Sequence, residues 1–264
     1  TDAKDRQIVH RDNSPWLAKH NPMRGKLGHS GIVNCCVVSQ DGIRALTCGG
    51  DRTAIYWDLT TGEALRLLND PHSGARMNNC SLMPKYGLGL TVSAFGPRLW
   101  DMHSGELLRT FCGHTNDVTD CQAILGGTKA LTCDNCGTVR VWDISQGNNA
   151  VDLATEEGHS HVVKELCIIP GEKLKALSCS YDKTAKVWDL TTGSCLATLT
   201  GHTGNVNQCC AFPAPADGQQ IRRVLTGSGD RKIKIWDWPS ETCELTLGGE
   251  QHTGEVRGFV EVTF

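Results

Sequence analysis

The chain has 264 residues, of which 39% are hydrophobic and 21% are charged, and its formal net charge at neutral pH is −3. This composition is typical of a folded globular protein, and no apolar run reaches the roughly 18 residues that a membrane helix needs. The weak negative charge also excludes the basic surface that proteins use to bind nucleic acid or anionic membranes, so we expect neither partner.

The first 20 residues form an N-terminal extension that shares no pattern with the rest of the chain. They mix charged and apolar residues where a secretory signal would have an apolar core. We therefore expect the protein in a reducing intracellular compartment, the cytoplasm, and the nucleus stays an open alternative. Trp16, the single large aromatic residue of this segment, is expected either to pack locally or to contact a partner.

A Trp-Asp pair recurs through residues 21–264. The pairs are Trp57-Asp58, Trp100-Asp101, Trp142-Asp143, Trp188-Asp189 and Trp236-Asp237. Successive tryptophans are 43, 42, 46 and 48 residues apart, which is close to the period of about 40–45 residues of a four-stranded blade. The spacing therefore predicts five complete repeats of one structural unit.

A histidine, usually preceded by glycine, begins each unit. The units start near His29, His72, His114, His159, His202 and His252. The first five histidines lie 28, 28, 28, 29 and 34 residues before their tryptophan, and an insertion at residues 214–220 accounts for the longest distance. The unit that starts at His252 reaches only Phe264, so it is the beginning of a sixth.

Short runs of strand length fill each unit, separated by turn residues. Examples are residues 176–180, 185–188, 195–199 and 206–212. A glycine five residues after the tryptophan marks a turn in four units, at Gly62, Gly105, Gly147 and Gly193. Because no window keeps a helical period, we expect an all-β fold.

The recurring Trp-Asp and Gly-His pairs resemble the WD-repeat (WD40) family of β-propellers. The resemblance implies a propeller of four-stranded antiparallel blades over residues 21–264. Residues 22–27 then correspond to an outermost strand, and the segment 255–264 matches only an innermost strand. Both ends together lack two strands of a sixth blade, so we expect residues beyond this sequence to complete a ring of six or seven blades.

The same resemblance implies a buried hydrogen-bond network in each unit, made by histidine, serine or threonine, aspartate and tryptophan. The complete sets are His29, Thr47, Asp51 and Trp57; His159, Ser178, Asp182 and Trp188; and His202, Thr226, Asp230 and Trp236. The physical reason is general, since a buried imidazole, hydroxyl and indole N–H each need a partner. A catalytic triad is needed once, so a group repeated in three units indicates a structural role.

Two units depart from this pattern. In the third, Cys136 stands at the position of the turn aspartate, which leaves His114, Thr132 and Trp142. In the second, residues 94–98 replace the usual Asp-x-Thr and include Pro97, which cannot donate a ladder hydrogen bond. We expect these two blades to be less rigidly braced.

The 14 cysteines follow the repeat rather than a disulfide framework. Cys48, Cys133 and Cys179 share one position, and the others that cluster around a second position are Cys35, Cys36, Cys80, Cys121, Cys167, Cys209 and Cys210. Both positions fall in predicted core strands, so these thiols are expected to be buried and inert. Cys133 and Cys136 form a Cys-x-x-Cys pair without a second pair, so no metal site is predicted.

Function is expected in the loop residues that do not repeat, because loops on a rigid scaffold carry binding sites. On the face of the histidine loops these are Arg76, Asn116, Asp117, His161, Lys164, Tyr181 and Asn205. We expect a non-catalytic scaffold that binds a peptide or protein domain within a multiprotein complex and needs no cofactor. The alternatives are a sensor or regulatory module of a larger multidomain protein, which other domains of that protein would contact, and an enzyme with a site in the channel.

Overall fold

A computed structural model describes residues 28–69, 74–124, 127–144, 150–152, 158–170, 174–212 and 223–248. Predictions that concern Trp16, residues 22–27, His72, Gly147, residues 214–220 and the segment from His252 to Phe264 lie outside these ranges. The described residues contain five four-stranded antiparallel sheets, which confirms the predicted blades. None of the described helices is long and apolar enough to cross a membrane.

Each sheet is one blade, and its strands follow one another in chain order. Blade 1 contains β1 (Val33–Val38), β2 (Arg44–Gly49), β3 (Thr53–Asp58) and β4 (Glu63–Asn69). Blade 2 contains β5 (Met77–Met83), β6 (Leu88–Ser93), β7 (Gly96–Asp101) and β8 (Leu107–Thr110), with the short 3-10 helix η1 (Pro84–Tyr86) between its first two strands.

The remaining three blades repeat this plan. Blade 3 contains β9 (Val118–Ile124), β10 (Lys129–Asp134), β11 (Val139–Asp143) and β12 (Ala150–Asp152). Blade 4 contains β13 (Val163–Ile168), β14 (Lys175–Ser180), β15 (Ala185–Asp189) and β16 (Cys195–Leu199). Blade 5 contains β17 (Val206–Ala211), β18 (Arg223–Ser228), β19 (Lys232–Asp237) and β20 (Thr242–Gly248).

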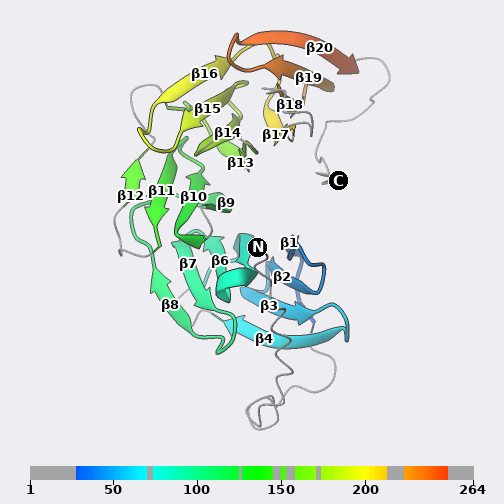
Figure 1. Ribbon diagram of the computed structural model, residues 1–264, viewed down its shortest axis with the longest axis vertical. Coiled ribbons are helices and arrows are strands. Elements are labelled where there is room, and N and C mark those ends of the chain that lie inside the picture. Colours follow the sequence, from blue (N-terminus) through cyan, green and yellow to red (C-terminus); the bar gives the residue numbers. More distant parts are fainter. Residues whose placement is uncertain are drawn as a thin grey trace, which may run out of the picture.

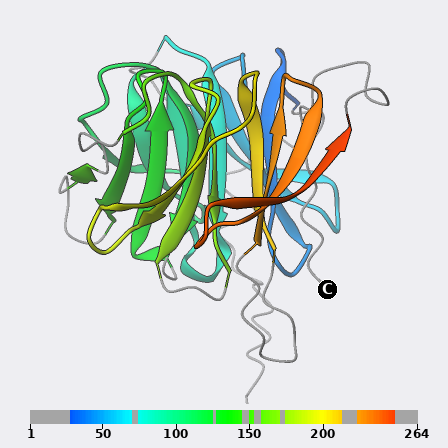
Figure 2. The same cartoon turned by 90° about the horizontal axis from the view of Figure 1, so that it is seen from above.

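The blades stand side by side as an arc around a central axis, and closure of a ring lies outside the described residues (Figure 1). The first strand of each blade faces the axis and the fourth strand is outermost. Seen from the side, each sheet is strongly twisted, so that β20 lies steeply across β17 and β18 (Figure 2). This twist is the normal right-handed twist of β-sheets.

The hydrophobic core is divided among the junctions between neighbouring blades. Trp100 of blade 2 packs against Leu46 and Cys48 of blade 1. Trp142, Trp188 and Trp236 occupy the same place at the next three junctions, and all four indoles are buried. Trp57 of blade 1 has no described blade packed over it, and it is only half-buried. Each of the four buried tryptophans therefore stabilises the contact with the preceding blade.

A β-bulge interrupts the first strand of every described blade near its start. The extra residue that the bulge inserts is Asn34, Asn78, Thr119, Lys164 or Asn207 in blades 1 to 5. A bulge turns one extra side chain out of the alternating pattern and increases the local twist. These five residues therefore occupy equivalent positions near the start of the innermost strands.

The cysteines are free thiols, and only part of the predicted burial holds. Cys48, Cys80, Cys121, Cys133, Cys179 and Cys209 are buried. Cys36 is exposed, whereas Cys35, Cys167 and Cys210 are partly exposed, so the prediction for the second cysteine position was wrong for these four. Neighbouring residues of a strand point to opposite faces, so two adjacent cysteines cannot both enter one core.

Candidate functional site

A linear chain of hydrogen bonds braces blade 1. The indole N–H of Trp57 donates to Thr47 Oγ1 at 2.8 Å, and Thr47 Oγ1 lies 2.8 Å from His29 Nε2. His29 Nδ1 lies 2.9 Å from Asp51 Oδ2. One tautomer satisfies every group: the Nδ1–H donates to the carboxylate, and Nε2 accepts from the threonine hydroxyl.

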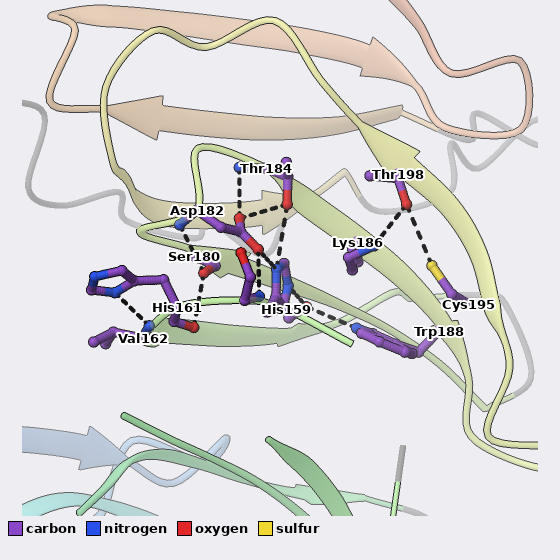
Figure 3. Close-up of polar contacts among 12 residues, drawn as sticks. His159, His161, Val162, Ser180, Asp182, Thr184, Lys186, Trp188, Cys195 and Thr198 are labelled. Atoms are coloured by element: carbon purple, nitrogen blue, oxygen red, sulfur yellow. Dashed lines mark hydrogen bonds and ion pairs between the residues drawn. The ribbon is translucent and has the colours of Figure 1, made fainter. Parts of the chain in front are cut away.

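Blades 4 and 5 contain the same chain. In blade 4, Trp188 donates to Ser178 Oγ at 2.7 Å, and His159 links this oxygen to Asp182, with 2.7 Å at each contact (Figure 3). In blade 5 the corresponding residues are Trp236, Thr226, His202 and Asp230, with contacts of 2.8 to 2.9 Å. The two aspartates also accept backbone N–H groups of their own turns and of the histidine loops. They therefore hold each histidine loop against the turn between the second and third strands of its blade.

Blade 3 is also fully braced, so the prediction of a weaker chain at Cys136 was wrong. Asp134 supplies the carboxylate: its Oδ2 lies 2.7 Å from His114 Nδ1, and His114 Nε2 lies 2.7 Å from Thr132 Oγ1. Trp142 completes the chain by donating to Thr132 at 2.7 Å. Asp134 stands two residues before the expected position, but its Oδ1 still accepts the backbone N–H groups of the turn, from Cys136 and Thr138.

Blade 2 retains only part of the chain among its described residues. Trp100 donates to Thr91 Oγ1 at 2.8 Å. The Arg98 guanidinium, which is buried, donates to Ser93 Oγ at 3.0 Å, close to where the other blades have their carboxylate. Pro97 lies within β7 and its carbonyl accepts from Phe111 N–H, so proline is tolerated in this strand.

The His–Asp–hydroxyl groups of blades 3, 4 and 5 are buried structural groups. The hydroxyls of Thr132, Ser178 and Thr226 belong to fully buried residues, and each accepts a tryptophan N–H. A nucleophilic hydroxyl needs an exposed oxygen and a base that is not already saturated. These groups therefore orient loops, and residues that bind a partner are to be sought elsewhere on the surface.

Burial and hydrogen bonding shift the pKa values of this network. Burial lowers the pKa of His159 and of His202, although the carboxylates of Asp182 and Asp230 act in the opposite direction. Burial opposes ionisation of Asp51, but hydrogen bonds from Thr53, from the Ser30 N–H and from His29 outweigh it and lower the pKa to about 2. At neutral pH, His159 and His202 are therefore neutral and Asp51 is ionised.

A pocket of about 390 Å³ lies where the innermost strands of the blades begin, and we call it the mouth pocket. Its lining residues are Asn34, Arg76, Asn78, Asp117, Thr119, Asn135, Val162, Lys164 and Tyr181. Most of them come from the innermost strands of blades 1 to 4 and the loops before these strands, whereas Asn135 and Tyr181 come from the turns after the second strands of blades 3 and 4. Two cations, one carboxylate and several amide and hydroxyl groups therefore face one space.

Three bulge residues connect neighbouring blades around this pocket. The Asn34 amide donates to the Met77 carbonyl at 2.7 Å, and the Asn78 amide donates to the Val118 carbonyl at 2.8 Å. The Thr119 hydroxyl donates to the Val163 carbonyl at 2.6 Å. The next bulge residue is Lys164, whose side chain is exposed. These three hydrogen bonds link blades 1 to 4 and hold the mouth pocket rigid. Lys164, the bulge residue of blade 4, adds an exposed ammonium group to it.

The structure brings four of the seven predicted binding residues together in the mouth pocket: Arg76, Asp117, Lys164 and Tyr181. Asn116, His161 and Asn205 are exposed on the loops before β9, β13 and β17 but do not line it. His161 still lies beside the pocket, because its ring centroid is 5.9 Å from that of Tyr181.

Asn34, Asn78, Thr119, Asn135 and Val162 line the pocket and were missed by the sequence prediction. A signal for part of this set exists in the spacing. Asn34, Thr119 and Lys164 each lie five residues after the histidine of their unit, and so does Asn207. A fixed distance from the histidine therefore identifies most of the bulge residues.

Four-stranded sheets in an arc around an axis, braced by one repeated hydrogen-bond chain, define the class of β-propellers built from sequence repeats. A family model described as "WD domain, G-beta repeat" matches residues 22–58, 105–143, 151–189 and 193–237. These matches cover more than half of the chain, and the chain belongs to the WD40 repeat family. They leave out residues 59–104, where most of blade 2 departs from the common pattern.

The curated relatives match this chain over part of their own length. Telomerase protein component 1 from Rattus norvegicus is 27% identical over 212 residues, which are 76% of this chain and 8% of that protein. The guanine nucleotide-binding protein subunit beta from Arabidopsis thaliana is 29% identical over 135 residues, which are 46% of this chain and 34% of that protein. The chain therefore spans less than a tenth of the first relative and about a third of the second.

Replacing Asp134 tests whether this residue supplies the carboxylate of the hydrogen-bond chain in blade 3. Asp134→Ala leaves the His114 ring and two turn N–H groups without their acceptor, so we expect the free energy of unfolding to fall by about 2–4 kcal/mol. Cys136→Ala is the matched control, because Cys136 is exposed, and it should change the free energy by less than about 0.5 kcal/mol. Urea denaturation followed by tryptophan fluorescence measures both, and equal losses would contradict the assignment of Asp134.

Acid should destabilise the protein in two stages. His159 and His202 have lowered pKa values when folded, so the unfolded chain takes up more protons just below its own value of about 6.5 and stability falls there. Asp51 contributes stability that is present above about pH 4 and lost as the pH falls towards about 2. Urea midpoints measured from pH 8 to pH 2 test this, and Asp51→Asn should reduce the lower stage without removing the upper one.

Proposed function

We propose that this chain is a non-catalytic scaffold that binds a peptide segment or a protein domain across the face of the mouth pocket, as part of a multiprotein complex. Propellers of the WD40 family typically act as protein-interaction scaffolds and are generally non-catalytic. The observation that carries the proposal is the convergence of Arg76, Asp117, Lys164 and Tyr181, which do not repeat between blades, on one pocket of a rigid repeated frame.

The chemistry of the pocket favours an acidic, extended segment. Arg76 and Lys164 outnumber the carboxylate of Asp117, so an acidic side chain or a C-terminal carboxylate is attracted there. Asn135 offers an amide that pairs with a peptide backbone, and the partly exposed ring of Tyr181 with the exposed ring of His161 gives an apolar edge with a polar tip. The hydrogen bonds around the mouth support binding without a large rearrangement of the pocket.

The second candidate is a sensor or regulatory module within a larger protein, with the other domains of that protein as its partners. It is supported by the small share of telomerase protein component 1, 8%, that this chain matches. Both candidates place a protein at the same face. An enzyme with a channel site is less well supported, because the buried hydroxyls are already occupied by tryptophan.

Replacing Lys164 and Tyr181 by alanine tests the binding face. We expect the double variant to lose at least about 90% of the proteins that co-purify with the unchanged protein from native extract, because an interface depends on a few central aromatic and charged residues. Quantitative mass spectrometry of the captured proteins is the measurement, and circular dichroism shows whether the fold is retained.

The matched control carries the same residue types on the other side of the molecule. Lys85 and Tyr86 are both exposed at η1, at the far end of β5 from Asn78. The variant Lys85→Ala with Tyr86→Ala should capture the same proteins as the unchanged chain. If the control loses the partners and the pocket variant keeps them, the proposal has the wrong face.

A further inference from the structure

Three ligating side chains meet at the junction of blades 4 and 5, away from the mouth pocket. They are Glu165 of β13, Cys179 of β14 and Cys209 of β17. One carboxylate oxygen and the two sulfur atoms all lie within 4.8 Å of one another. Among the residues that the structure describes, no other three His, Cys, Asp or Glu donors are grouped so closely.

The fold produces this grouping through register. Glu165 follows the bulge of β13 and is the cross-strand partner of Cys179. Cys209 is the second residue after the bulge of β17, and its backbone N–H donates to Glu165 Oε2 at 2.7 Å. The carboxylate is therefore oriented by the neighbouring blade, as outer partners orient metal ligands in known sites.

The equivalent positions at the other junctions hold different side chains. They are Asn79, Val92 and Cys121 between blades 2 and 3, and Asp120, Cys133 and Leu166 between blades 3 and 4. Between blades 1 and 2 they are Cys35, Cys48 and Cys80, which are less closely grouped. A carboxylate with two thiols therefore occurs at one of the four described junctions, which makes it a property of this chain rather than of the repeat.

We propose that Glu165, Cys179 and Cys209 bind a thiophilic divalent cation, zinc in the first instance, with water as the fourth ligand. Two thiolates and one carboxylate form a donor set that zinc accepts in tetrahedral geometry. Thiolates at about 2.3 Å from a tetrahedral ion lie about 3.8 Å apart, so the donors, which lie within 4.8 Å of one another, need to approach by at most about 1 Å.

A second cavity gives the cation a route to the site. Its volume is about 420 Å³, and it is lined by Gln122, Glu165, Leu166, Cys167, Ile168, Pro170, Cys209 and Cys210. Two of the three ligands therefore face this space, whereas Cys179 lies buried behind them. The cavity also has room for the water ligand.

Zinc binding by the purified full chain tests the proposal. The protein is stripped with a chelator under a phosphine reductant, loaded with Zn²⁺, desalted, and assayed for zinc per chain by mass spectrometry. We expect Glu165→Gln to bind one zinc fewer than the unchanged protein. Glutamine keeps an oxygen that accepts the Cys209 N–H, so this variant should fold. Cys209→Ala should show the same loss, and Cys133→Ala, at the position of Cys179 in blade 3, should show none.

Cobalt gives an independent reading of the ligands. Co²⁺ bound to thiolates produces a sulfur-to-metal charge-transfer absorption, which we expect in the unchanged protein and in Cys133→Ala but not in Cys209→Ala. Zinc should also raise the melting temperature of the unchanged protein more than that of Glu165→Gln. Equal zinc content and equal melting shifts in all variants, or no bound metal in any, would overturn the site.

Discussion

The hydrogen-bond chain from tryptophan to hydroxyl, histidine and aspartate is the interaction on which the other features depend. It joins the loop before the first strand, the second strand, the turn that follows and the third strand within one blade. Every group in it has one compatible role, so losing any member leaves a buried polar atom without a partner. Because the aspartates also bind the histidine loops, the chain fixes the loops from which Asp117 and His161 come.

The junctions between blades combine a constant frame with variable chemistry. The bulge residue and the two residues after it occupy the same place in every described blade, but one junction presents amides, another a buried aspartate and another a glutamate with two thiols. Tryptophan packing keeps the blades together at each junction. The frame therefore tolerates side chains of very different charge at positions between the blades.

Sequence reasoning predicted the fold well because its signals are local and repeated. The Trp-Asp and Gly-His spacing specifies which run is which strand, and the loop residues that do not repeat between units include Arg76, Asp117, Lys164 and Tyr181. It missed Asp134 because the repeats were aligned at a fixed spacing, which places the aspartate at residue 136. Asp134 stands two residues earlier, at the end of β10, and still reaches His114. It missed Asn34 and Asn78 because a bulge redirects a side chain that alternation assigns elsewhere. Glu165, Cys179 and Cys209 lie 14 and 30 residues apart, and only the contact between blades brings them together.

The placement of each tryptophan on the preceding blade gives the arc a direction. Every blade has one face that contributes an indole and another that receives one, so the blades associate head to tail through a single heterologous type of contact. The two end faces of the described arc are consequently the two halves of that same contact: blade 1 offers the half-buried Trp57, and blade 5 offers a receiving face with no indole from a described blade upon it. Blades can be added or exchanged in such an array only with their polarity preserved.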